Sequence, residues 1–201
     1  VNTPDKDGWT LLHIAAKSGN EAILDALITA GVNIEGLDAK NNSTPLHWAI
    51  YNNHPEIAKL LINKGANINA KNNGNLTPLH FAGLNNQVEL IDKLIKLNVD
   101  KNAQDTLGKT ALHMAAMRGK SESVAKLIEL GADINTKDFN GEDALYYAAE
   151  NGYIQVVDKL IRSGANKDLI YKDGNTALHI AAKNGWTKTV AKLFDLGVDK
   201  E

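Results

Sequence analysis

Apolar residues return in the same arrangement at regular intervals along this chain of 201 residues. In one stretch Ile57, Leu60 and Leu61 share one helical face while Lys59 and Lys64 fall elsewhere, which is the i, i+3, i+4 pattern of an amphipathic helix. The apolar end of this pattern recurs at Leu27-Ile28, Leu94-Ile95, Leu127-Ile128, Leu160-Ile161 and Leu193-Phe194. The pattern therefore predicts a series of short helices rather than one large core.

A second pattern, a four-residue block, fixes the period of this series. The block begins at Thr10, Thr44, Thr77, Thr110, Asp143 and Thr176, and it reads Thr-Pro-Leu-His at Thr44 and Thr77. The intervals between these starts are 34, 33, 33, 33 and 33 residues. A fixed period of this length is typical of a solenoid. We place the one extra residue in the loop around Asp38 to Ser43.

Two further positions in each unit carry only Gly or Asn. They are Gly19, Asn53, Asn86, Gly119, Gly152 and Gly185, and then Gly31, Gly65, Asn98, Gly131, Gly164 and Gly197. These residue types suit the left-handed backbone at a helix end, so each unit is expected to contain two short helices. The Thr, or Asp143, is predicted to cap the first helix, and the Ala pairs after each block are expected to face the neighbouring unit.

These features together resemble an ankyrin repeat array that covers the whole chain. The resemblance implies a mainly α solenoid whose unit is a β-turn or hairpin followed by two antiparallel helices. We expect a single repeat domain over 1–201, with a repeat tail at 1–4 and units at approximately 5–38, 39–71, 72–104, 105–137, 138–170 and 171–201. Asp143, Tyr146 and Tyr171 depart from the family pattern, so the turn bonds of their units are expected to differ.

The two ends of the chain fall inside repeats. Val1-Asn2 matches Ile68-Asn69, and the chain ends just after the second helix expected in the sixth unit. We therefore expect the chain to be part of a longer array.

Composition narrows the function classes. The net charge of −2 argues against a general electrostatic grip on nucleic acid or anionic membrane, and no apolar run is long enough to cross a bilayer. The chain contains no Cys, which removes thiolate zinc sites and cysteine nucleophiles. We expect a cytoplasmic protein that is monomeric as an isolated domain.

We expect no metal site, no cofactor and no catalytic residue. His13, His47, His80, His113 and His179 all occupy the repeating block, and stacked units roughly 8 to 10 Å apart cannot bring them to one ion. The resemblance implies a structural hydrogen-bonding role for them. Gly108-Lys109-Thr110 imitates a phosphate loop, but Ala103 stands where that motif needs Gly.

The remaining candidate is a binding surface made by turns and first helices, which solenoids of this class use as a concave face. At variable positions there, apolar residues stand where polar ones are usual, and we predict one patch across the third to fifth units with flanking contacts. The predicted partner-binding residues are Trp9, Tyr51, Leu76, Leu84, Leu107, Met117, Arg118, Phe139, Asn151 and Tyr171. In contrast, Trp48, Phe81, Met114 and Tyr147 share a slot with Ile14 and Ile180, which we assign to the core.

The sequence thus favours a non-catalytic module that binds a protein partner of unknown identity. The alternative is a regulatory or targeting arm of a larger enzyme, toxin, channel or bacterial effector whose active part lies outside this chain. The Asn- and Lys-rich composition would suit an effector of an intracellular bacterium, which would act in the host cytosol.

Overall fold

The computed structural model describes residues 3–198, which fall into two compact units, the N-terminal unit (Val1–Asp100) and the C-terminal unit (Lys101–Glu201). The expectations for residues 1, 2 and 199–201 lie outside the described residues. The N-terminal unit contains α1 (Leu11–Ser18), α2 (Glu21–Thr29), α3 (Pro45–Tyr51), α4 (Pro55–Asn63), α5 (Pro78–Leu84) and α6 (Val88–Lys96). The C-terminal unit contains α7 (Ala111–Met117), α8 (Ser121–Glu129), α9 (Ala144–Glu150), α10 (Ile154–Arg162), α11 (Ala177–Lys183) and α12 (Thr187–Asp195).

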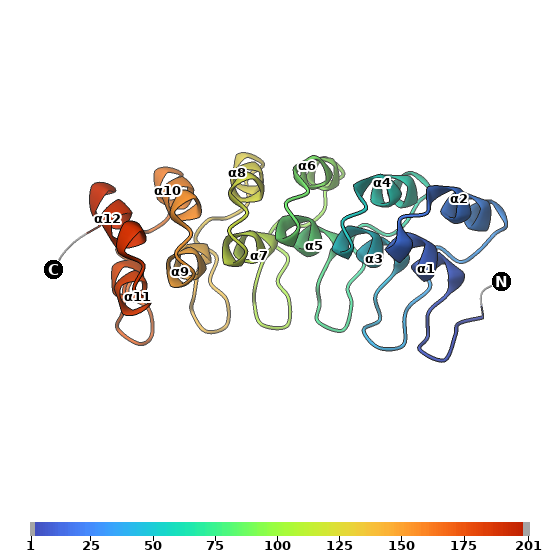
Figure 1. Cartoon of the computed structure of the whole chain (residues 1–201), viewed down its shortest axis with the longest axis horizontal. Helices are drawn as coiled ribbons and strands as arrows, with labels where there is room; N and C mark the ends of the chain where they lie inside the picture. The colour runs from blue at the N-terminus through green and yellow to red at the C-terminus, as the bar shows by residue number, and fades with distance from the viewer. Residues whose placement is uncertain (1–2, 199–201) are drawn as a thin grey trace. The chain divides into compact units, whose positions relative to one another are not determined.

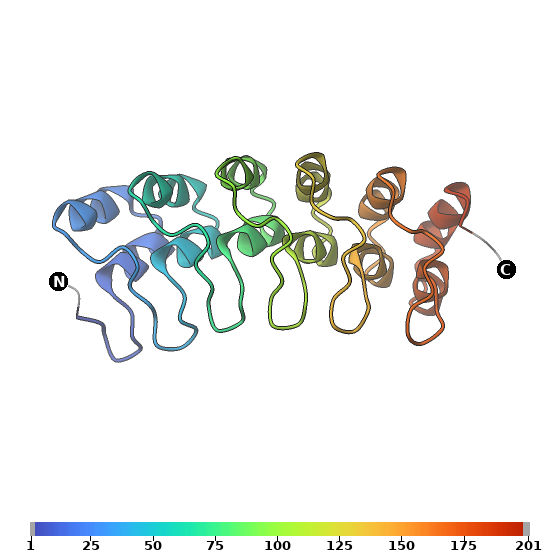
Figure 2. The same cartoon turned by 180° about the vertical axis from the view of Figure 1, so that it is seen from behind.

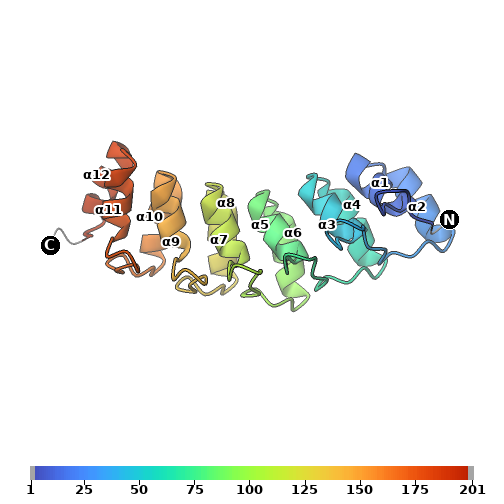
Figure 3. The ribbon, with the colours of Figure 1, turned by 90° about the horizontal axis from the view of Figure 1, so that it is seen from below.

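Within each unit the chain repeats a turn, a first helix and a second helix three times. Each first helix lies between the turns and the second helices (Figure 1), and the chain descends from each second helix to the next turn (Figure 2). Viewed from below, the turns of each unit project to the same side (Figure 3). First helices pack on the next first helix, as α1 does on α3 and α7 on α9. The helical solenoid expected from the sequence is confirmed, and within residues 3–198 all regular secondary structure is helical.

The Thr-His block closes the start of each first helix. The side chain of His13 accepts the backbone N–H of Thr10 at Nδ1, 3.1 Å away, and Thr10 Oγ1 accepts the N–H of His13. Equivalent capping boxes form at Thr44, Thr77, Thr110 and Thr176, which confirms the predicted caps. Asp143 performs this task alone by accepting the N–H of Tyr146 at 2.9 Å.

The predicted Gly and Asn positions all adopt positive φ. Asn tolerates this conformation at Asn53, Asn86 and Asn98, while Gly19 is required for a second reason. A Cβ on Gly19 would lie 2.6 Å from the His54 ring, which belongs to the next repeat. Nε2 of His54 also bonds to the carbonyl of Lys17 at 3.0 Å, so this ring joins two repeats.

The extra residue lies where the sequence places it. In regular turns the first N–H donates to a carbonyl four residues later, as Asp105 does to Lys109 at 2.9 Å. In the second repeat the N–H of Asp38 donates to Ser43, five residues later, at 3.1 Å. This turn is therefore one residue longer than its counterparts.

The core consists mainly of leucines and alanines, with isoleucines and valines among them. Leu12, Leu46, Leu79, Leu112 and Leu145, one from each of the first five repeats, are at most 2% exposed. The Ala pairs of the first helices are buried as expected, except that Ala182 in α11 is exposed.

One core prediction is wrong in part. Of the residues that share the Ile14 slot, Tyr147 and Ile180 are buried, but Ile14 is 48% exposed. Trp48, Phe81 and Met114 are half-buried. The slot faces the turns, so its burial depends on what the neighbouring turn supplies. Tyr147 is covered because its hydroxyl donates to Asp138 and Glu142 of its own turn.

Candidate interaction surface

The turns and first helices of each unit form what we call the first-helix face. In the N-terminal unit, Trp9 and Leu76 lie in turns and Leu84 ends α5, and all three are half-buried. Tyr51 ends α3 and is 52% exposed. The four predicted contact residues of this unit therefore all belong to the first-helix face.

Aromatic rings run along this face from one repeat to the next. The Trp9 and Trp48 ring centroids are 4.5 Å apart, and Tyr51 stands edge-to-face with Trp48 at 5.8 Å and with Phe81 at 5.7 Å. The Lys17 ammonium lies 4.8 Å from the Trp9 ring centroid. Edge-to-face pairs of this kind are stabilising and hold each ring in one orientation.

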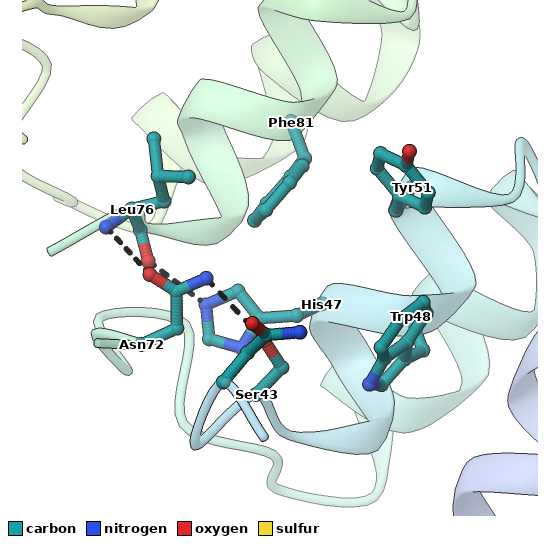
Figure 4. Close-up of a pocket in the computed structure, with 8 residues that line it drawn as sticks. Ser43, His47, Trp48, Tyr51, Asn72, Leu76 and Phe81 are labelled. Atoms are coloured by element: carbon teal, nitrogen blue, oxygen red, sulfur yellow. Dashed lines mark hydrogen bonds between the residues drawn. The ribbon is translucent and has the colours of Figure 1, made fainter. Parts of the chain in front are cut away.

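The gap between α3 and α5 is a pocket of about 260 Å³, which we call the aromatic pocket (Figure 4). Its apolar walls are Trp48, Tyr51, Leu76 and Phe81, and its polar lining is Asn41, Ser43, His47 and Asn72. Figure 4 shows the aromatic rings on one side and Leu76, Asn72 and Ser43 on the other. The pocket depends on the long turn, because that turn supplies both Asn41 and Ser43.

His47 forms the centre of the polar lining. Its Nε2 bonds to the carbonyls of Ala70 and Leu76, both at 3.1 Å, and since a carbonyl only accepts, Nε2 carries the proton. Burial lowers the pKa of His47 to about 4, although both carbonyl bonds oppose this shift. The ring is therefore neutral at pH 7.

The C-terminal unit places two large apolar side chains at its turn tips. Leu107 is 58% exposed and Phe139 is 67% exposed, and the Phe139 N–H donates to the Leu107 carbonyl at 3.0 Å. The two predicted contact residues are thus brought together by a bond between adjacent turns. Met117 ends α7 and is half-buried, and Arg118 follows it on the surface.

Two predicted contact residues, Tyr171 and Asn151, make hydrogen bonds within the fold. Tyr171 is 5% exposed, and its hydroxyl donates to Asp143 at 2.9 Å. This bond holds the ring at the boundary between two repeats, while Ile170 beside it is exposed, and the partner-binding role of Tyr171 stays a prediction. Asn151 is half-buried, and its amide donates to the Tyr147 carbonyl at the end of α9.

Carboxylates gather near the rings of the C-terminal unit. Glu142, Tyr146, Lys172 and Asp173 line a pocket of about 250 Å³. Burial raises the pKa of Tyr146 to about 12, and the charges of Glu142 and Glu150 add to this shift. Burial, together with the charge of Glu142, also raises the pKa of Glu150. This pocket is therefore charged, whereas the aromatic pocket is not.

Sequence reasoning missed the aromatic pocket, because Trp48 and Phe81 share the slot of Ile180, which is buried. The available signal was the extra residue in the long turn, which marks the second repeat as different. The single patch expected across the third to fifth units joins residues of both compact units and stays a prediction.

Residues 3–198 hold no group of three or more His, Asp or Glu side chains that could bind a metal ion. Within the same range, no helix has the length and apolar character needed to span a membrane.

Comparison with known proteins identifies the repeat. A family model described as ankyrin repeats in three copies matches residues 1–72, 64–138 and 136–201. The chain belongs to the ankyrin repeat family. The ankyrin segments of curated relatives are similar over about a third of the chain.

Three such relatives are much longer proteins. The chain is 42% identical over 66 residues to putative palmitoyltransferase ZDHHC13 of Danio rerio, which covers 33% of this chain and 10% of the relative. It is 37% identical over 65 residues to SMC5-SMC6 complex localization factor protein 1 of Homo sapiens, which covers 32% of this chain and 6% of the relative. It is 35% identical over 65 residues to the B-cell lymphoma 3 protein homolog of Mus musculus, which covers 32% of this chain and 14% of the relative. The match thus spans a small fraction of each relative.

Proposed function

We propose that this ankyrin array is a non-catalytic protein-binding module and that the first-helix face is its contact surface. Ankyrin repeats are in general protein-interaction modules, and this array shares their fold. The cytoplasmic location and the monomeric state expected from the sequence are parts of this proposal.

The distribution of exposed apolar side chains carries the proposal. Eleven large hydrophobic side chains are exposed among the described residues. Seven lie in first helices, in turns or directly before a turn, namely Leu11, Ile14, Leu37, Tyr51, Leu107, Phe139 and Ile170. Clustered exposed apolar residues mark interaction surfaces, and aromatic residues are enriched among the positions that contribute most binding energy. Leu107 and Phe139 are the strongest pair, because both are more than half exposed and their turns are bonded together.

Two matched double variants test the proposal. The full chain is used to capture a partner from lysate, and the dissociation constant of the identified partner is then measured. We expect Leu107→Ala with Phe139→Ala to weaken binding by tenfold or more, on the order of the effect of losing interface anchors. The control pairs Ile23→Ala with Phe194→Ala, which are exposed on second helices. Equal losses in both variants, or a loss that merely follows a fall in Tm, would contradict the proposal.

A second candidate is that the array serves as the regulatory or targeting arm of a larger protein. The observation that favours it is the size of the relatives, since the matched segments cover only 6% to 14% of the three proteins described above. The coding frame on both sides of the array tests this candidate. A further folded domain in the same frame would support it, and an immediate start and stop would contradict it.

A further inference from the structure

The aromatic pocket has incomplete aromatic walls. The Tyr51 ring stands at 88° to Trp48 and 86° to Phe81, so the rings meet edge-to-face rather than stacked. Trp48 and Phe81 are half-buried and Tyr51 is more than half exposed, which leaves ring surface uncovered toward the pocket (Figure 4). A further aromatic ring from a partner would add contacts of the same kind.

The pocket lining is uncharged at pH 7. The lining side chains are aromatic, aliphatic, hydroxyl or amide groups, together with the neutral His47. The nearby Asp38 carboxylate is itself buried, and it accepts bonds from the Trp48 indole at 3.0 Å and from backbone N–H groups of its turn. A charged side chain would lose hydration here without gaining a counter-charge, which is costly. A neutral occupant is therefore favoured over Lys, Arg, Asp or Glu.

Polar groups at the pocket have unused hydrogen-bonding capacity. Ser43 is 4% exposed, and its Oγ accepts a bond from the Asn72 amide at 3.3 Å. Within residues 3–198 its hydroxyl proton meets no acceptor, and the Asn41 side chain makes no hydrogen bond. Asn72 Oδ1 is already occupied by the N–H groups of Gly74 and Leu76. An occupant that both accepts and donates would satisfy Ser43 and Asn41 together.

We propose that the aromatic pocket binds a tyrosine side chain of a protein partner. The ring lies between the aromatic walls, while the phenol oxygen accepts from Ser43 and donates to Asn41. Phenylalanine would offer no hydrogen bond to either Ser43 or Asn41, and an indole N–H only donates. The pocket volume of about 260 Å³ is below the range of roughly 300–1,000 Å³ usual for small-molecule sites, as suits one side chain. This inference rests on the proposed protein-binding function and specifies one recognised residue.

The test titrates the full ¹⁵N-labelled chain with N-acetyl amides of tyrosine, phenylalanine, tryptophan and lysine. We expect the tyrosine amide to shift the resonances of Ser43, Asn41 and the Trp48 indole, and to bind about three- to tenfold tighter than the phenylalanine amide. Ser43→Ala should remove this preference while leaving phenylalanine affinity within about twofold. Asn41→Ala, at a half-buried position, gives the same test if Ser43→Ala fails to fold. Phe194→Ala in α12 is the control and should change nothing.

Several outcomes would overturn the inference. These are equal affinity for tyrosine and phenylalanine, tightest binding of lysine, no binding of any probe, shifts confined to other residues, and a tyrosine preference that survives in the Ser43 and Asn41 variants. The proposed function is judged separately by the captured partner. If Leu107→Ala with Phe139→Ala weakens that complex while Ser43→Ala and Asn41→Ala do not, the protein-binding function stands and the tyrosine inference fails.

Discussion

His47 shows how one buried residue links repeats and responds to pH. Its Nδ1 accepts the Thr44 N–H at 3.1 Å, while its Nε2 bonds to the carbonyls of Ala70 and of Leu76, the latter in the following repeat. The bond at Nδ1 requires the neutral ring, because a protonated Nδ1 cannot accept, whereas Nε2–H donates to its carbonyls in either state. Burial also lowers the pKa of His13 and of His113, whose Nε2 atoms bond to Ser43 and Glu142 carbonyls. Protonation therefore acts against the bond that Nδ1 accepts from the Thr N–H in several repeats.

The free energy of unfolding should fall as the solution is acidified from pH 7 to pH 5. The pKa of His47 is lowered from 6.5 to about 4 by folding, so between these values the unfolded chain binds a proton that the folded chain does not. The stabilisation is complete above pH 7 and is lost as the pH falls toward 4. At pH 5 the expected loss from His47 alone is about 2 kcal/mol, and urea unfolding at the two pH values is the measurement that checks it.

Two variants show whether His47 is responsible. His47→Gln should reduce the difference between pH 7 and pH 5 by about 2 kcal/mol, whatever its own stability. Ile50→Val, at a fully buried position of the same helix, should cost about 0.5–1.5 kcal/mol yet keep the wild-type pH dependence. An unchanged pH dependence in His47→Gln would show that His47 is not the titrating group.

At the scale of elements, two departures from the repeat pattern compensate each other. Asp143 replaces Thr at the start of α9, and Tyr171 replaces the Asp or Asn that begins the other turns. The structure joins them, because the Tyr171 hydroxyl donates to Asp143 Oδ1 at 2.9 Å. Burial raises the pKa of Asp143, and the bonds from Tyr146 and Tyr171 oppose that shift. The two substitutions therefore form one contact between the fifth and sixth repeats.

Tyr171→Phe should lower the free energy of unfolding by about 1–3 kcal/mol, because it removes one donor from a buried carboxyl group. The control is Tyr153→Phe, since the half-buried Tyr153 makes no hydroxyl hydrogen bond within the described residues. That control should change stability by less than about 0.5 kcal/mol in the same chemical denaturation experiment. Equal effects of the two variants would mean that the bond contributes nothing.

The helices were predictable and the pocket was not, for a physical reason. Helix starts and ends depend on local chemistry, so Thr44 with His47, or Gly19 alone, is enough to place them. Burial of a ring in this slot depends on the turn that faces it. Tyr147 and Phe81 occupy equivalent positions. Tyr147 is buried and donates its hydroxyl proton to a carboxylate, whereas Phe81 lines a pocket. The Tyr147 hydroxyl makes the difference, but the slot pattern alone does not show that its turn supplies two carboxylates within reach.

At the scale of whole units, packing is confined to neighbours. In the N-terminal unit α1 packs on α2 and α3, while α5 packs on α3 and α6. Leu12 in α1 and Leu90 in α6 are both fully buried, but they belong to different repeats of the unit. Stability in such arrays is approximately a sum of repeat and interface terms. A substitution that destabilises one repeat should therefore lower the stability of the next repeat more than that of the repeat after it.

Leu12→Ala tests this in the intact chain. The substitution should lower the free energy of unfolding of the first repeat by about 2–5 kcal/mol. Native-state hydrogen exchange should then show the largest loss of protection in α1 and α2, a smaller loss in α3 and α4, and the smallest in α5 and α6. Leu11→Ala is the matched control, because Leu11 is adjacent but 48% exposed, and it should leave the profile unchanged. A uniform loss through all six helices would instead show that the N-terminal unit opens as one cooperative core, in which case the additive description would not apply to it.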